Sequence, residues 1–419
     1  MTEAVTVHGA DWISNVPEHV DTMVGPVTLA AVGYTRDRLE CRAITERTGP
    51  MNATLRYVGL DVHKDSTVMA VAEGSGGDAV VWGRMGSDPA EVERALAQLG
   101  GPIWVRACYE AGPTGYGLVR RLRAAGYTCD VIAPSLVPKD SRRVKTDPRD
   151  AMRLAHFLRS GDLTPVAVPE ASTEAIRDLV RARNAAKKIE RVSRHQLQKF
   201  LLRHGRIYSK GGDWTIAHGL WVRSQTFAFP ALTATFEDAM QTVEQASARV
   251  HRLTESIREH VANWSGGALV QALQAFRGIQ LVTAATVVAE IGDFQRFPSP
   301  RHLMAYLGLV PSEHSSGASR RQGGITRTGN GHVRCVLVEA AWSYRMRPQL
   351  SKAIASRNEG VSAGVRAIAW KAQLRLHKRY VRLIHRGKCK QEVVVAIARE
   401  LAGFVWAAAR ERAWLDPVV

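Results

Sequence analysis

The chain has 419 residues, 45% of them hydrophobic, which is enough for two or three domains with buried cores. It carries 57 lysines and arginines against 39 acidic residues, and the formal net charge of +18 favours a polyanionic partner. No run approaches the ~20 apolar residues that a membrane-spanning helix needs. The first 50 residues also lack the pattern of a secretory signal. We therefore expect a cytoplasmic protein with no membrane partner.

The cysteines are widely scattered and form neither a CxxC pair nor a Cys/His cluster at zinc spacing. They lie at positions 41, 108, 129, 335 and 389. We expect reduced thiols, without a disulfide framework or a zinc site.

Residues 1–50 show no clear periodicity, and Met51 opens a sequence typical of a folded domain. We interpret 1–50 as an N-terminal extension that is disordered or precedes the true start. Residues 51–168 then alternate between β-rich and helical patterns, which predicts an α/β domain. Its expected strands are 55–62, 66–73, 79–85, 102–110 and 128–134, and its expected helices are 91–99, 116–126 and one beginning at Asp147.

Residues 169–265 contain two long amphipathic runs, 172–205 and 236–264. They predict an antiparallel or intermolecular coiled coil that serves assembly. In the remaining region, 266–419, two helices around the turn at 276–280 resemble a helix-hairpin-helix, although a plain helical hairpin fits equally well. A loop rich in glycine and arginine at 315–332 leads into further helices.

Two carboxylates lie on predicted strands. Asp61 shares one strand face with Gly59, between apolar residues that face the other way. A carboxylate there is costly unless it is paired or bound to a metal, and His63 or Lys64 is a structural alternative as partner. Glu110 ends its strand, where a polar side chain in an α/β sheet often faces a ligand crevice.

Two more carboxylates, Asp147 and Asp150, begin the helix in KTDPRDAMRLAHFL. Asp147 before Pro148 fits a helix N-cap, and a carboxylate at Asp150 favours the helix dipole, so capping alone explains both. Positions i and i+3 also share a helix face. With Asp61 and Glu110 they make four carboxylates, whose mutual repulsion is relieved by Mg²⁺ or Mn²⁺.

Three segments, YVGLDVHKDS, CYEAGPTGYGL and VKTDPRDAMRLA, resemble the DEDD motif of the RuvC-like, ribonuclease-H-type domain in the IS one-ten family of insertion-sequence transposases. Further on, LMAYLGLVPSEHSSGASRRQGGITRTGNGHVRCVLVEAAW is similar to the C-terminal transposase domain of that family. The resemblance covers about 56–406. It implies a fold of the α/β plus all-α class, with a RuvC-like mixed-sheet domain, a helical coiled-coil region and a helical transposase domain.

The resemblance also implies a recombinase that inserts DNA by cleavage, strand exchange and religation, guided by a structured bridge RNA. Asp61, Glu110, Asp147 and Asp150 would hold Mg²⁺ or Mn²⁺. Ser316 would be the nucleophile that forms a covalent 5′-phosphoserine link, although Ser315 and Ser319 compete with it on local sequence alone. Donor and target DNA, the bridge RNA and a dimer or tetramer of the chain are the implied partners, and the cytoplasmic protein would associate with the nucleoid.

Basic side chains flank both sets of residues, and guanidinium groups are natural clamps for phosphate. We expect nucleic-acid contacts from Arg320, Arg321, Arg327, Lys139, Arg142, Arg143 and Lys145, although such a run is often only a solvated surface.

Three alternatives remain open. A RuvC-like metal-dependent nuclease would use the carboxylates without the serine. A site-specific DNA invertase would use the same residues as a transposase. A non-catalytic nucleic-acid-binding protein would need only the basic surface.

Overall fold

The computed structural model describes residues 54–137, 146–313, 321–411 and 413–415. They form two compact units, which divide between Pro169 and Glu170. The predicted extension, 1–50, lies outside the described residues. Among the helices that the structure describes, none is long and apolar enough to cross a bilayer. The division into four regions that the sequence suggests stays a prediction.

The N-terminal unit is built on a mixed five-stranded sheet in the order β3-β2-β1-β4-β5. Strand β1 pairs antiparallel with β2 and parallel with β4, which places it at the centre. The strands are β1 (Arg56–Val62), β2 (Ser66–Glu73), β3 (Val80–Gly86), β4 (Val105–Glu110) and β5 (Thr128–Ile132). All five strands expected from the β-rich runs are therefore present.

The two faces of the sheet are covered by different helices. Val58 and Leu60 of β1 are fully buried in a core shared with α1 (Pro89–Leu99) and α2 (Gly117–Ala124). On the opposite face, buried side chains of β2 and β4 contact α3 (Asp147–Ser160). The alternation predicted for β1 is thus confirmed, and Gly59 and Asp61 share the face that α3 covers.

Gly59 allows α3 to approach β1 closely. A Cβ atom at this position would lie 2.2 Å from the carbonyl oxygen of Ala151 and 2.5 Å from the amide nitrogen of Ala155, both backbone atoms of α3. Backbone atoms cannot rotate away as a side chain can. A residue without a side chain is therefore required here, and the start of α3 is held over the end of β1.

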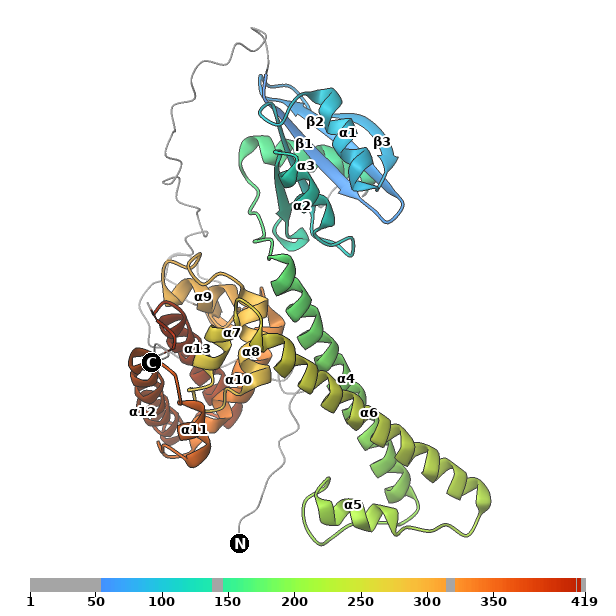
Figure 1. Ribbon diagram of the computed structural model, residues 1–419, viewed down its shortest axis with the longest axis vertical. Helices are drawn as coiled ribbons and strands as arrows, with labels where there is room; N and C mark the ends of the chain where they lie inside the picture. The colour runs from blue at the N-terminus through green and yellow to red at the C-terminus, as the bar shows by residue number, and fades with distance from the viewer. Residues whose placement is uncertain (1–53, 138–145, 314–320, 412, 416–419) are drawn as a thin grey trace. The chain divides into compact units, whose positions relative to one another are not determined.

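The second unit begins with two long helices, α4 (Ala171–Arg203) and α6 (Pro230–Ala262), each ~50 Å long. They run antiparallel side by side, with α5 (Ile216–Arg223) at their far end (Figure 1). Between them, Ser247 donates a hydrogen bond of 3.0 Å to buried Glu190. The predicted coiled coil is therefore an antiparallel pair within one chain.

The remaining helices pack on the other end of this pair and share one core with it. They are α7 (Gly267–Leu273), α8 (Leu281–Ile291), α9 (Pro300–Tyr306), α10 (Gly331–Ala341), α11 (Lys352–Arg357), α12 (Ala363–His385) and α13 (Lys390–Ala409), with the hairpin β6 (Pro311–Glu313) and β7 (Gln322–Ile325) between α9 and α10. A mixed α/β unit followed by a helical unit confirms the expected fold class.

Buried Glu290 of α8 links three elements of this unit. Arg181 of α4 donates to both of its carboxylate oxygens, at 2.7 and 2.9 Å. Asn330 donates to the same carboxylate at 2.8 Å and also caps α10 by accepting from the amide of Val333. Burial raises the pKa of Glu290, but these hydrogen bonds and the charges of Arg181 and Arg177 outweigh burial and leave the pKa lowered.

We predict that Gly59→Ala destabilises the N-terminal unit by about 1–3 kcal/mol, because the added methyl group forces α3 away from β1. Gly83→Ala on β3 is the matched control, since nothing lies within 4 Å of its Cβ position, and its effect should stay within about 0.5 kcal/mol. Amide hydrogen exchange of peptides from β1 and α3 in the full chain measures both. Unchanged protection in Gly59→Ala would show that the close approach is dispensable.

Candidate functional site

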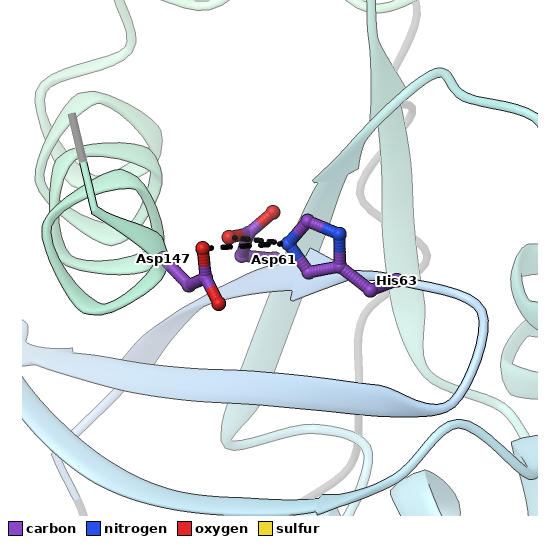
Figure 2. Close-up of side chains that lie close together, drawn as sticks. All are labelled: Asp61, His63 and Asp147. Carbon is purple, nitrogen blue, oxygen red and sulfur yellow. Dashed lines mark hydrogen bonds and ion pairs between the residues drawn. The ribbon is translucent and has the colours of Figure 1, made fainter.

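Asp61, His63 and Asp147 come together at the end of β1 (Figure 2). His63 Nε2 lies 3.2 Å from Asp61 Oδ2 and 3.6 Å from Asp147 Oδ1. One ligand atom from each of the three side chains lies within 4.8 Å of the others. The site is open on one side, since the His63 side chain is 54% exposed and that of Asp61 only 21%.

Strand register places Glu110 beside Asp61. Leu60 pairs with Tyr109 in the parallel β1–β4 ladder, and both strands continue by one residue to a carboxylate. Paired residues of neighbouring strands point to the same face, here the one that α3 covers. The sheet therefore presents two adjacent carboxylates to the start of this helix.

Asp147 does not act as the helix cap that the sequence suggested. Thr146 holds the N-cap position, Asp147 and Pro148 follow it within the helix, and no side chain caps the end. Asp147 instead pairs with Arg84 of β3 at 3.0 Å, in addition to its contact with His63. Asp147 is thus the first residue inside the helix and not the cap before it. From there its carboxylate points toward β1 and β3.

Asp150 and Glu110 are connected through Arg153 of α3. Arg153 Nη2 lies 3.0 Å from Asp150 Oδ1 and 4.0 Å from Glu110 Oε1. Asp150 is only 6% exposed, so the arginine stabilises a carboxylate that has left water. The four predicted carboxylates thus form two linked pairs on one face of the sheet.

The pKa of Asp61 is raised by burial and by the neighbouring carboxylates. Burial raises it most, the hydrogen bond and charge of His63 lower it, and the charges of Asp147 and Asp150 raise it further, leaving a net increase. A carboxylate surrounded in this way is destabilised in its charged form. A bound cation would relieve both the burial cost and the repulsion.

The donor set fits a hard divalent cation. Asp61 and Asp147 offer carboxylate oxygens, the ligands that Mg²⁺ prefers, and Asp150 lies within electrostatic range of Asp61. The imidazole of His63 is not a preferred Mg²⁺ ligand. The carboxylates are therefore the groups that could hold such a cation, with His63 as their hydrogen-bonding partner.

The predicted nucleophile Ser316 lies outside the described residues, as do Arg320, Lys139, Arg142, Arg143 and Lys145. The residues that bracket Ser316 are described. Strands β6 and β7 form a short antiparallel ladder in which Pro311 pairs with Ile325 and Glu313 with Gln322. The described residues on either side of the serine are thus neighbours in one antiparallel ladder.

Both described arginines of the predicted phosphate clamp, Arg321 and Arg327, are exposed. Arg327 adopts φ +56°, which is uncommon for a residue with a side chain, and its amide donates to the carbonyl of Gly308 at 3.1 Å. A Cβ on Gly308 would lie 2.4 Å from the carbonyl oxygen of Thr328. This tight turn fixes the backbone at Arg327.

Three basic side chains contact the carboxylates, and the sequence predicts these contacts only weakly or not at all. The sequence named His63 as a structural partner of Asp61, and that contact exists. Arg153 follows Asp150 by three residues, a spacing that predicts an ion pair on a helix. Arg84 reaches Asp147 from β3, and only the sheet order, which local pattern does not reveal, brings these two together.

Two family models match the chain. Residues 58–205 match a DEDD-type transposase model of IS110 elements, and residues 270–355 match a model described as transposase of the IS116/IS110/IS902 family. The first covers the four carboxylates, and the second covers the β6–β7 hairpin. These matches, with the acidic site on a mixed sheet, define the chain as a transposase.

Relatives agree with the models. A Sinorhizobium fredii protein named as transposase y4qE is 46% identical over 388 residues, which cover 90% of this chain and 96% of the relative. The transposase for insertion sequence element IS1533 of Leptospira borgpetersenii is 30% identical over 330 residues, 77% of this chain and 95% of the relative. The chain belongs to the IS116/IS110/IS902 family of transposases.

A shorter match is to a protein named for a different activity, DNA inversion. The pilin gene-inverting protein of Moraxella bovis is 26% identical over 147 residues, which cover 34% of this chain and 38% of that protein. The family resemblance therefore extends to a protein named for DNA inversion.

We predict that Asp61→Asn weakens Mn²⁺ binding at least about tenfold, because it removes an anionic ligand at the centre of the carboxylate group. Asp65→Asn is the matched control, since Asp65 is exposed in the turn after β1 and is not one of the three clustered side chains. Isothermal titration of the full chain with Mn²⁺ measures both variants. Equal affinities would place the cation elsewhere.

Proposed function

We propose that this transposase excises and inserts an insertion sequence by DNA cleavage, strand exchange and religation through a covalent 5′-phosphoserine intermediate, guided by a bridge RNA. The observation that carries the proposal is the convergence of Asp61 and Asp147 from separate elements, within electrostatic range of Asp150. Family membership supports DNA as the substrate of this acidic site.

The four carboxylates would hold one or two Mg²⁺ or Mn²⁺ ions, which when bound polarise the scissile phosphate and stabilise charge on its oxygens. The chain's own residues prepare this site. Arg153 pairs with the buried Asp150, and Arg84 with His63 orients Asp147. Because these contacts already hold the carboxylates, less reorganisation would be needed on binding.

In the proposed cleavage step, the hydroxyl oxygen of Ser316 forms a bond to the phosphorus and the bond from phosphorus to the 3′ oxygen breaks. The serine gives up its proton, and the departing 3′ oxygen gains one. In religation, a 3′ hydroxyl of the exchanged strand attacks the phosphoserine and releases the serine. Each step breaks one phosphoester bond and forms another, so rejoining needs no ATP.

Arg320, Arg321 and Arg327 would hold phosphates beside the serine, since guanidinium binds phosphate through two oxygens. The fixed turn at Arg327 supports this role. Lys139, Arg142, Arg143 and Lys145 precede the acidic helix and would contact nucleic-acid backbone near the carboxylates.

The net charge of +18 suits a chain that handles both donor and target DNA together with an RNA. Base pairing by the bridge RNA would supply sequence specificity, so the protein itself would read duplex shape and backbone. Several strands must be cut and held, and we propose that a dimer or tetramer acts in the cytoplasm at the nucleoid. The four regions 1–50, 51–168, 169–265 and 266–419 remain our proposed domain division.

DNA inversion is the second candidate, and the match to the pilin gene-inverting protein favours it. Inversion uses the same cleavage and religation and differs in the arrangement of the recombining sites. Sequencing the products on a plasmid that carries both arrangements would separate the two.

We predict that the full chain with its co-purifying RNA and Mg²⁺ forms a covalent adduct with DNA bearing the element ends. Ser316→Ala should abolish the adduct, because the attacking oxygen is lost. Denaturing gel electrophoresis with end-labelled DNA detects it.

Ser319→Ala and Ser315→Ala are the matched controls in the same loop, and both should retain the adduct. An adduct that survives Ser316→Ala but not Ser319→Ala would move the nucleophile. Cleavage without any adduct would indicate a plain metal-dependent nuclease.

A further inference from the structure

A basic groove of about 1130 Å³ lies within the second unit, between α4 on one side and α8, α10 and α13 on the other. We name it the α4 groove and define it by its basic wall, Arg183, Lys187, Lys188, Arg191 and Arg194, and by Arg334 on the opposite side. Seven lysines and arginines line it against two glutamates. Its chemistry is that of a site for phosphates.

Part of this charge is already balanced within the protein. Glu190 takes Lys187 and Arg194 as partners, each at 2.6 Å. Arg183, Lys188 and Arg334 differ, because none of them forms an ion pair with a carboxylate among the residues that the structure describes. Arg183 donates only to the hydroxyl of Thr254, and Arg334 to the carbonyls of Leu307 and Thr328.

Burial makes the charges of Arg183 and Arg334 costly. The pKa values of both are lowered, first by burial, and Arg334 is only 8% exposed. The charge of Glu190 offsets part of this cost for Arg183, whereas Arg334 is hydrogen-bonded to carbonyls alone, and a buried charge without an anionic partner is expensive. A phosphate in the groove would provide the missing anions.

The shape of the basic wall suits one strand of a duplex. Asn184, Lys187, Lys188, Arg191 and His195 follow one face of a straight helix and line the groove. From Asn184 to His195 the helix rises ~16 Å. The wall is therefore long enough to contact more than one successive phosphate of a single strand.

The opposite side links the groove to the proposed chemistry. Ile325 of β7 lines the groove, and β7 belongs to the hairpin whose described ends bracket Ser316. The first turn of α8 also lines it, from Gln280 to Thr283, and no side chain caps this helix. Backbone amides at the start of a helix favour an anion and here add to the arginines and lysines.

We propose that the α4 groove binds the sugar-phosphate backbone of the DNA strand that is cut, at successive phosphates along α4. The assignment to DNA rests on the proposed function, because the groove adjoins the hairpin of the proposed nucleophile. Contacts to phosphates do not depend on the DNA sequence. This agrees with the proposal that base pairing by the bridge RNA supplies the sequence specificity.

The test compares two charge reversals on α4, Lys188→Glu and Lys199→Glu, in the full chain with its co-purifying RNA. Lys188 lies in the groove, whereas Lys199 is exposed on the same helix outside it. Fluorescence anisotropy with a DNA duplex of random sequence should show severalfold weaker binding for Lys188→Glu. Its slope of log Kd against log salt should also fall by about one. Lys199→Glu should match the parent.

Exposed Cys335 lines the groove and provides a second readout. A duplex with a disulfide-activated tether on its backbone should cross-link to the parent chain and not to Cys335→Ser. Cys389→Ser, which removes an exposed cysteine outside the groove, should still cross-link.

All chains in these assays carry Ser316→Ala, so DNA binding is measured without cleavage. The result therefore does not depend on whether Ser316 forms an adduct. Equal effects of Lys188→Glu and Lys199→Glu, with no cross-link through Cys335, would overturn the proposal. A tethered RNA duplex forms the parallel arm. Cross-linking of RNA in place of DNA would also overturn it and assign the groove to the guide.

Discussion

The backbone contact between β1 and α3 at Gly59 is the constraint on which the acidic site depends. Asp61 lies two residues further along β1, and Asp147 and Asp150 lie in the first turns of the helix that Gly59 admits. A side chain at Gly59 would push α3 away from β1, because backbone atoms of α3 occupy the space that its Cβ atom would need. One small residue therefore sets the distance among three acidic groups.

The site is balanced between attraction and repulsion. Arg84, Arg153 and His63 each pair with a member of the carboxylate group, while burial and the neighbouring carboxylates raise the pKa of Asp61. A bound cation would lower the cost of keeping Asp61 charged in this surrounding.

Much of the N-terminal fold follows from local pattern. Alternation of buried residues in β1 predicted the face of Asp61, and apolar runs bounded by turns predicted the five strands. The start of α3 was displaced by one residue, because proline fits either of the first two helical positions and the tertiary contacts of Asp147 decide between them. The partner of Asp147 on β3 depends on strand order, which no local pattern contains.

The second unit shows a similar division. Two amphipathic runs predicted long helices, but the sequence alone left open whether they pair within one chain. Two contacts settle the pairing, since Ser247 donates to Glu190 and Phe236 near the start of α6 stacks on Phe200 near the end of α4, which together make the helices antiparallel. The α4 groove arises only when α4 packs beside α8 and α10, so the local pattern of α4 could not predict it.

The central claim is that the carboxylates from β1 and α3 form one metal site. Anomalous diffraction at the manganese edge, on crystals of the full chain grown with Mn²⁺, tests it most directly. We predict anomalous density within about 2.0–2.6 Å of carboxylate oxygens of Asp61 and Asp147. Absence of density there at saturating Mn²⁺, with Asp61 still bonded to His63, would contradict the claim and make these carboxylates structural.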